Sequence, residues 1–282
     1  MDYILDVKNL TKKYENFTLN KVSFSLEKGK ITGFIGRNGA GKTTTFKSLF
    51  NFVHPDAGDV VVFGKSFKEN ELDIKSRIGF VLGGASYYPN KKVKTITEAA
   101  KTFYSRWDDD EYRFYLERFG IDDNKTVSKL SSGTKVKYAL ALALSHHAEL
   151  LILDEPTSGL DPVSRDEILQ IFLDLVERGI TILFSTHITS DLDYCADNII
   201  YIKNGEIIAE NKLSVFIDQY QILEFNKEHL SEDLISKAIG HRRTKNGTSL
   251  LFFKDVVVQE PHKRIKTDLD AIMVHLEQEN HL

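Results

Sequence analysis

Cysteine, long apolar segments and an export signal are all scarce or lacking in this sequence. Cys195 is the only cysteine among 282 residues, so no disulfide can form within the chain and a reducing compartment such as the cytoplasm is expected. The longest apolar runs, such as residues 139–144, are far shorter than the roughly 18 residues that a membrane-crossing helix needs. The first residues lack a basic start and an apolar stretch, so we expect no export signal. If the protein works at a membrane, another chain must supply the crossing.

The sequence also lacks an excess of basic charge. Lys and Arg total 37, Asp and Glu total 41, and the formal net charge is −4. The basic residues form no arm or stripe, so nucleic acid is not an expected partner. Hydrophobic residues make up 41% and charged residues 28% of the chain, which is typical of a soluble globular protein.

Length and patterning predict one large domain with a small appendage. A chain of 282 residues exceeds one average domain but is too short for two full-sized ones. We expect the main domain over residues 1–213, with a helical subdomain at about 85–149, because aromatic and charged residues there recur at helical spacing. Residues 214–282 restart as a mixture of strands and helices that ends in an amphipathic helix near 268–277. This last part is interpreted as an α+β appendage.

Strands and helices alternate through the main domain. After the antiparallel strands of the N-terminal part, buried strands are expected at 150–153 and 180–184, separated by a helix that begins after Asp161-Pro162. A second helix is expected at about 134–147, and Asn204-Gly205 predicts a hairpin. This order predicts a parallel sheet covered on both faces. The N-terminal β-prone runs are residues 4–7, 17–19, 22–26 and 31–35.

A glycine-rich loop lies between a predicted strand and a predicted helix. Residues 36–43 fit the pattern G-x-x-x-x-G-K-[ST] in the structural context that this motif requires. Glycines let the backbone N–H groups face phosphates, and the helix N-terminus adds partial positive charge. Lys42 would reach the β and γ phosphates and Thr43 would ligate Mg²⁺, so the loop predicts binding of ATP with Mg²⁺. The loop residues expected to hold the nucleotide are Gly36, Asn38, Gly39, Ala40, Gly41, Lys42, Thr43 and Thr44.

Two carboxylates follow the buried strand at 150–153. Asp154 and Glu155 come at the carboxyl end of that strand, where ligands bind in open α/β sheets. Asp154 would hold the metal through a water, because Mg²⁺ keeps much of its hydration shell. Glu155 would orient and polarise the water that attacks the γ phosphate. An acidic pair that only caps the turn before Pro156 is the alternative.

The motifs together resemble the nucleotide-binding subunit of an ABC transporter over residues 4–213. Besides the phosphate loop and the acidic pair, the chain carries three further elements of the family pattern. In sequence order they are Leu130-Ser131-Ser132-Gly133-Thr134, Ser158-Gly159-Leu160-Asp161 and His187. The resemblance implies a P-loop NTPase (RecA-like) α/β core with an antiparallel β subdomain and an α-helical signature subdomain. It also implies a transport-coupled ATPase that works at the cytoplasmic face of the cell membrane and touches the membrane only through a transmembrane permease subunit.

The resemblance assigns further residues to a shared site. Two such subunits, identical or paralogous, would sandwich two ATP molecules, so that Ser131 and Gly133 of one meet the phosphates held by the other. By the same resemblance His187 would contact the γ phosphate, Tyr14 would stack on the adenine and Asp161 would cross the dimer interface. The alternatives are that His187 is a structural histidine, that Tyr14 only packs against its neighbours and that Asp161 is a helix N-cap.

The sequence departs from the family pattern at three places, one of which is Thr134, where glutamine is common. Gly83 stands where the family usually has a glutamine that touches the metal, so we expect slow hydrolysis without the partner and faster hydrolysis in a Gly83→Gln variant. Ser132 replaces a glycine, and a positive φ there would cost about 1 kcal/mol. Residues 85–107 occupy the place where the family docks its membrane subunit, and their aromatics are Tyr87, Tyr88, Phe103, Tyr104 and Trp107.

Three classes of function compete. The favoured one is an exporter ATPase of Gram-positive type, because residues 130–137 most resemble the groups that serve antimicrobial peptides and phenol-soluble modulins. An ABC ATPase acting on ribosomes or DNA would carry two cassettes or a long coiled coil, and the sequence has neither. A small-molecule kinase or a GTPase would not need the element at 130–134. The cargo cannot be named, since its binding site should lie in the membrane chain.

Overall fold

The structure is a computed structural model that describes residues 2–82 and 88–278. The chain divides into two compact units. The first comprises Met1–His187 and Tyr194–Glu210, and the second comprises Ile188–Asp193 and Asn211–Leu282. Each unit contains its own β-sheet structure and its own apolar core.

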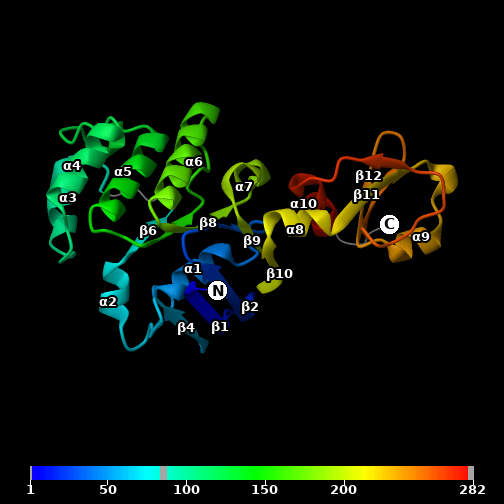
Figure 1. The fold of residues 1–282 in the computed structure, drawn as a ribbon, viewed down its shortest axis with the longest axis horizontal. Coiled ribbons are helices and arrows are strands. Elements are labelled where there is room, and N and C mark those ends of the chain that lie inside the picture. The colour runs from blue at the N-terminus through cyan, green and yellow to red at the C-terminus, as the bar shows by residue number, and fades with distance from the viewer. Residues whose placement is uncertain (1, 83–87, 279–282) are drawn as a thin grey trace. The chain divides into compact units, whose positions relative to one another are not determined.

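An antiparallel sheet opens the first unit (Figure 1). Its order is β2 (Thr18–Glu27), β1 (Tyr3–Lys13), β4 (Ala57–Val62) and β5 (Lys65–Ser66). The prediction of two separate strands at 17–19 and 22–26 was wrong, because β2 runs through both. Lys21 adopts a left-handed backbone conformation with a φ of 47°, and the register with β1 shifts between Leu10 and Lys12. The pairing therefore continues past the interruption in the apolar pattern.

The central sheet carries the carboxyl ends on which the site is built. Its order is β10 (Glu206–Lys212), β9 (Asn198–Lys203), β3 (Ile31–Ile35), β8 (Thr181–Thr186), β7 (Leu150–Asp154) and β6 (Ile78–Leu82). All strands from β9 to β6 are parallel. Every residue of β3, β7 and β8 is buried, as continuous apolar runs require in a covered parallel sheet. Asn204 and Gly205 both have positive φ and join β9 to β10 in the predicted hairpin.

Helix α1 (Lys42–Leu49) lies between the two sheets of the first unit (Figure 1). Phe46, Leu49 and Phe50 at its inner side belong to one apolar core with Phe24 of the antiparallel sheet and Phe34 of the central sheet. The ring of Phe34 meets those of Phe24 and Phe46 at centroid distances of 5.6 and 5.3 Å. The phosphate loop that precedes α1 is therefore anchored in the main core.

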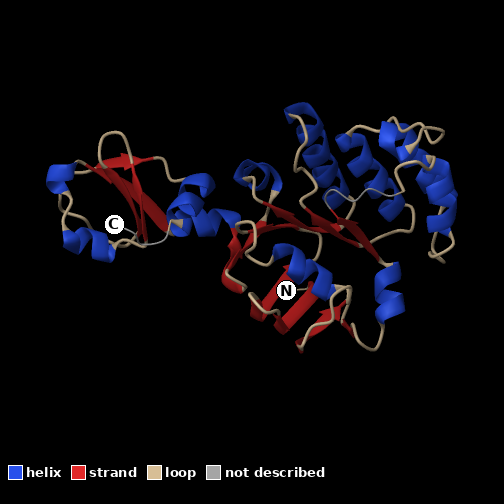
Figure 2. Ribbon diagram, turned by 180° about the vertical axis from the view of Figure 1, so that it is seen from behind, coloured by secondary structure: helices blue, strands red, loops and turns tan. Residues whose placement is uncertain are grey.

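Helices cover the opposite face of the central sheet, as Figure 2 shows. Helix α5 begins at Ser132 rather than at the predicted residue 134, because the Ser131 side chain caps it. The Thr97 hydroxyl lies 2.7 Å from that of Tyr112 and 3.0 Å from that of Tyr138, which ties three of these helices together. The helices are α3 (Val93–Lys101), α4 (Asp109–Arg118), α5 (Ser132–Leu144) and α6 (Pro162–Glu177), with a 3-10 turn at Val127–Lys129.

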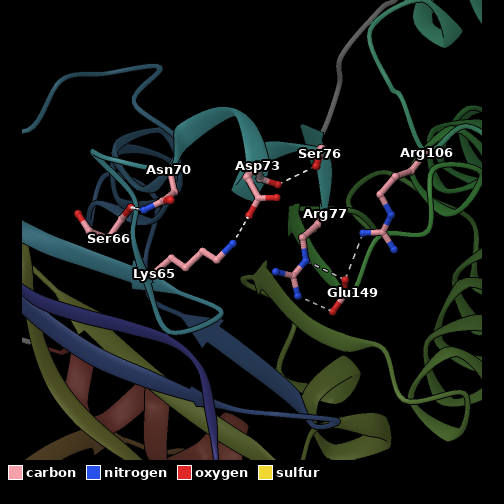
Figure 3. Close-up of polar contacts among 8 residues, drawn as sticks. All are labelled: Lys65, Ser66, Asn70, Asp73, Ser76, Arg77, Arg106 and Glu149. Atoms are coloured by element: carbon pink, nitrogen blue, oxygen red, sulfur yellow. Dashed lines mark hydrogen bonds and ion pairs between the residues drawn. The ribbon is translucent and has the colours of Figure 1, made fainter.

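An ion-pair network links the helical segment to the start of two sheet strands (Figure 3). Arg77, just before β6, donates two hydrogen bonds of 2.8 Å to the Glu149 carboxylate before β7. Arg106, between α3 and α4, reaches the same carboxylate at 3.3 Å. These bonds, led by that of Arg77, hold the pKa of Glu149 below its usual range. In the same view, Asp73 of α2 (Glu71–Ser76) pairs with Lys65 of β5.

The second unit is a four-stranded antiparallel sheet with helices. Its order is β12 (Gly240–Arg243), β13 (Thr248–Phe253), β11 (Tyr220–Phe225) and β14 (Lys263–Ile265). On one face of the sheet, Leu223 and Phe252 pack with Leu234 of α9. On the other face, a hydrogen bond of 2.9 Å between Ser249 and His275 joins the sheet to α10. The helices of this unit are α8 (Leu213–Asp218), α9 (Glu232–Lys237) and α10 (Leu269–Glu277), with a 3-10 turn at Lys227–His229. Helix α7 (Thr189–Cys195) belongs to this unit only as far as Asp193.

Candidate functional site

The phosphate loop connects β3 to α1, as its sequence predicts. Gly39 and Gly41 have φ angles of 85° and 114°, values that residues with a side chain rarely adopt. A Cβ on Gly36 would lie 2.3 Å from the Ile202 carbonyl oxygen, and one on Gly41 would lie 2.9 Å from Phe17 Cζ. Both the backbone angles and the close neighbours therefore require glycine here.

Lys42 is folded back over the loop. Its side chain is only 6% exposed, and its Nζ donates a hydrogen bond of 2.7 Å to the Gly36 carbonyl oxygen. The same Nζ lies 3.4 Å from Glu155 Oε1. A buried ammonium held by carbonyl and carboxylate oxygens has a fixed position, which suits the binding of phosphate oxygens.

Asp154 ends β7 beside the first turn of α1. Its carboxylate accepts hydrogen bonds from the Thr43 hydroxyl at 2.8 Å and from the Ser185 hydroxyl at 2.6 Å. Asp154 and Ser185 are partners in the parallel pairing of β7 with β8, so the sheet register itself brings them together. The two residues predicted as metal ligands, Thr43 and Asp154, are thus in direct contact.

Glu155 bridges two other predicted site residues. One carboxylate oxygen faces Lys42, and Oε2 lies 2.7 Å from Nδ1 of His187. Its backbone is left-handed, with a φ of 51°, and its N–H donates to the Ser185 hydroxyl at 2.9 Å. Such a conformation costs a non-glycine residue roughly 1 to 2 kcal/mol, and strain of this kind concentrates at functional sites.

A cavity of about 600 Å³ opens in front of these groups. Most of the loop residues predicted from the sequence line it, together with Glu155 and His187. The sequence assigned no nucleotide-binding role to four of its lining residues. Asn16 and Phe17 stand outside the motifs, Arg37 occupies a variable position of the loop, and Ser158 opens the element at 158–161.

Some predicted residues lie away from the described wall of this cavity. Ser131 and Asp161 act as N-caps, with Ser131 Oγ accepting from the Thr134 N–H at 3.1 Å and Asp161 Oδ1 accepting from Ser164 N–H at 3.1 Å. The hydrogen bonds from Ser164 hold the pKa of Asp161 below its usual range. Gly133 is buried, and a Cβ on it would lie 3.0 Å from Ser164 Cβ. Tyr14 is also absent from the described lining.

Two of the departures from the family pattern, at Ser132 and Gly83, have different outcomes. Ser132 is the first helical residue of α5 and is not among the described residues with positive φ, so the strain considered for it does not arise. Gly83 lies outside the described residues, as does Tyr87 of the predicted docking segment.

Comparison with known proteins identifies the family. The family model described as ABC transporter matches residues 19–158. Over 218 residues the chain is 35% identical to the bacitracin transport ATP-binding protein BcrA of Enterococcus faecalis, covering 76% of this chain and 71% of the relative. The chain belongs to the ABC transporter ATP-binding family.

Other relatives and solved structures of ABC proteins agree. The lantibiotic transport ATP-binding protein SrtF of Streptococcus pyogenes is 32% identical over 212 residues, which cover 74% of this chain and 91% of SrtF. The ATP binding subunit of an ABC transporter superposes with a TM-score of 0.69 at 25% identity, over 77% of this chain and 92% of that one. The cbiO1 protein of Clostridium perfringens superposes with a TM-score of 0.65 at 28% identity, over 77% of this chain and 91% of that one. This chain is therefore an ATP-binding ABC ATPase with the predicted P-loop fold.

This ABC ATPase has a second concave surface, a groove of about 390 Å³. Its floor includes the rings of Tyr104 and His146, which stack at a centroid distance of 3.9 Å, and His146 Nδ1 lies 3.1 Å from the Ser76 carbonyl oxygen. Phe52, on the turn after α1, is 58% exposed at its wall. The other lining residues are Phe50, Lys75, Ile78, Phe80, Ala100, Ala139, Leu142 and Ala143.

Acid should destabilise this ATPase in part through His146. Burial is the main cause that lowers the pKa of His146 from 6.5 to about 4. The unfolded chain therefore takes up a proton at a higher pH than the folded chain does. The neutral ring makes its full contribution to the free energy of unfolding above pH 6.5, and this contribution is lost as the pH falls toward 4. We expect a loss of about 2 kcal/mol in unfolding free energy between pH 7 and pH 5 from this group, measured by urea denaturation.

A non-titrating variant isolates this effect. His146→Gln should lose the corresponding part of the pH dependence, whereas His229→Gln, at an exposed position, should keep it. Identical pH slopes for the wild type and His146→Gln would contradict the expectation.

Among the described residues no helix is long and apolar enough to cross a membrane.

Proposed function

We propose that this chain is the energy-coupling subunit of an exporter for amphipathic or antimicrobial peptides or other toxic compounds. The observation that carries the proposal is Glu155, held between Lys42 at 3.4 Å and His187 at 2.7 Å beside the phosphate loop. The names of two relatives, which refer to bacitracin and lantibiotic transport, support a peptide-like cargo. The cargo would pass through a separate transmembrane subunit.

The residues at the end of β7 fit a magnesium nucleotide. Thr43 Oγ1 and Asp154 Oδ2 lie 2.8 Å apart and offer oxygen ligands of the kind that Mg²⁺ prefers. We assign the metal to these two residues and the phosphates to Lys42 and the loop N–H groups. When bound, the metal supplies charge neutralisation for the phosphate oxygens.

Glu155 serves as the general base in this proposal. Its carboxylate would accept a proton from the attacking water, and His187, within hydrogen-bond distance of it, would keep the carboxylate and the water aligned. The fixed left-handed backbone of Glu155 limits the directions in which the carboxylate can point. Positioned acid–base groups of this type contribute about 100- to 10,000-fold to a rate.

The same site is completed by a second subunit in this proposal. Ser131, Gly133 and Asp161 lie outside the described lining of the cavity, yet Ser131 and Asp161 stand at the N-termini of α5 and α6. Helix N-termini favour negative charge, so the start of α5 suits the phosphates held by another copy or by a paralogue. Asp161 would cross the interface between the two copies. ATP would then join the two subunits and hydrolysis would separate them.

The groove described above suits the transmembrane partner. Its wall combines exposed Phe52 with the apolar Phe80 and Leu142, and Lys75 lies at its edge. Exposed Tyr88 and Phe103 belong to the segment predicted to dock the membrane subunit. A permease segment bound here would place the ATPase peripherally on the cytoplasmic face of the membrane, and the chain would touch the membrane only through this partner.

Disruption of the groove tests the proposal. Phe52→Asp should remove most of the multi-span membrane protein that co-purifies with the tagged wild-type chain from detergent-solubilised membranes, because a charge would be buried at an apolar contact. Nucleotide affinity should stay unchanged. Phe114→Asp, at a similarly exposed aromatic of α4, is the matched control and should retain the partner. Equal recovery with Phe52→Asp and wild type, or absence of any membrane protein, would count against the proposed docking site.

A further inference from the structure

One buried hydroxyl contacts both acidic residues of the site. Ser185 of β8 is fully buried, and its Oγ lies 2.6 Å from Asp154 Oδ1 and 2.9 Å from the backbone nitrogen of Glu155. A carboxylate accepts hydrogen bonds and a backbone N–H donates one, so the single hydroxyl proton goes to Asp154 while the oxygen accepts from Glu155. The hydroxyl is therefore directed at the two residues to which the proposed function assigns the metal and the attacking water.

The pairing of two strands explains why Ser185 reaches this place. Ser185 is the register partner of Asp154 in the parallel pairing of β8 with β7, and the side chains of such partners lie on the same face of a sheet. His187 follows two residues later, and its Nδ1 lies 2.7 Å from Glu155 Oε2. The end of β8 therefore supplies one contact for Asp154 and two contacts for Glu155.

Each acidic residue depends on this hydroxyl in a different way. Asp154 accepts from Ser185 through Oδ1 and from the Thr43 hydroxyl through Oδ2, the latter at 2.8 Å, so its carboxylate cannot turn without breaking a hydrogen bond. Glu155 has a left-handed backbone with a φ of 51°, a conformation that persists only where surrounding contacts hold it. Its N–H has the Ser185 carbonyl oxygen at 3.2 Å and the hydroxyl oxygen closer, at 2.9 Å. Ser185 thus fixes the carboxylate of one residue and the backbone of the other.

We infer that Ser185 is a positioning residue that couples metal binding to hydrolysis through a single hydroxyl. It stands outside the described lining of the nucleotide cavity and acts through Asp154 and Glu155. The inference rests on the roles that the proposed function gives these two residues, and it is independent of the cargo and the membrane partner. Loss of a side chain that hydrogen-bonds a metal-binding carboxylate from behind typically lowers metal affinity or activity by about 10- to 100-fold.

The magnesium dependence of ADP binding tests Ser185 without any turnover. Titration calorimetry gives the affinity for ADP with Mg²⁺ and with EDTA, and the ratio of the two affinities is the magnesium enhancement. Ser185→Ala should lower this enhancement by roughly 10-fold, because Asp154 loses its fixed direction, whereas the affinity in EDTA should stay the same. At saturating MgATP the kcat of the same variant should fall by roughly 10- to 100-fold. Ser185→Thr, which keeps the hydroxyl, should retain more of both than Ser185→Ala does.

Thr181→Val is the matched control at the other end of β8. Thr181 is also fully buried, and its Oγ1 accepts a hydrogen bond of 2.9 Å from the Gly29 N–H. The variant removes a buried hydroxyl from the same strand but away from the acidic pair. Its melting temperature should fall, as should that of Ser185→Ala, whereas its magnesium enhancement and its kcat should match those of the wild type.

Several results would overturn the inference. It fails if Ser185→Ala keeps the wild-type magnesium enhancement, if it weakens ADP binding equally in EDTA, or if Thr181→Val shows the same losses. A wild type without any magnesium enhancement would refute the metal role of Asp154 and the inference together, whereas enhancement that Ser185→Ala retains would refute the inference alone. If Ser185→Ala does not fold, Ser185→Cys takes its place and should show the same losses, because a thiol is a weak hydrogen-bonding group.

Discussion

Glu155→Gln should reduce ATP hydrolysis by about 1000-fold while ATP binding persists. The amide has the shape of the carboxylate but cannot take a proton from water at neutral pH. It also lacks the negative charge that faces Lys42 at 3.4 Å, so the phosphate end of the cavity becomes more positive and nucleotide affinity should hold or rise. Steady-state phosphate release measures the rate, and calorimetry measures the affinity.

The same variant should also trap the dimer. Because ATP is not consumed, two subunits joined by it should remain together, and size-exclusion chromatography with MgATP should show a dimer that the wild type does not accumulate. Glu149→Gln is a suitable control, since Glu149 precedes the other end of β7 and pairs with Arg77 away from the cavity. Wild-type turnover by Glu155→Gln would overturn the assignment of the base.

Lys42→Ala should weaken MgADP binding by about 100-fold or more. Charge-assisted hydrogen bonds contribute roughly 1.5 to 3 kcal/mol each, and the Lys42 ammonium can reach more than one phosphate oxygen. Its removal also takes away the ammonium that faces the Glu155 carboxylate at 3.4 Å, so Lys42 no longer offsets the negative charge beside the phosphates. Calorimetric titration with MgADP provides the measurement.

Lys47→Ala gives the matched comparison on the same helix. Lys47 stands in the last turn of α1, away from the described lining of the cavity, and its loss should leave MgADP affinity within about twofold of the wild type. Thermal melting of both variants checks that α1 remains folded. Retention of wild-type affinity by Lys42→Ala would contradict the assigned role.

Local motifs made the phosphate end of the site predictable. The pattern at residues 36–43 specifies strand, loop and helix together, and the apolar run before Asp154 specifies a buried strand whose end reaches the same edge of the sheet. The resemblance to ABC subunits supplied His187, and the parallel pairing of β8 with β7 explains why it lies beside Glu155. The loop and the acidic pair follow from short stretches of sequence and from one topological rule.

The remaining part of the cavity lining could not be predicted in the same way. Asn16 and Phe17 lie in a turn of the antiparallel sheet, and they reach the cavity only because that sheet packs on α1. Nothing in their local sequence specifies this packing. The stacking of Tyr104 on His146 and the continuity of β2 through Lys21 likewise depend on contacts between distant segments.

Helix α1 has a mechanical consequence. Its first residues, Lys42 and Thr43, line the nucleotide cavity, while Phe50 and Phe52 just beyond its last turn line the groove. Eight helical residues span about 12 Å, and a short helix clamped in a close-packed core moves as a rigid rod. Any displacement of the phosphate loop along that axis is therefore transmitted to the groove with little loss, so α1 connects the nucleotide cavity mechanically to the surface proposed to bind the partner.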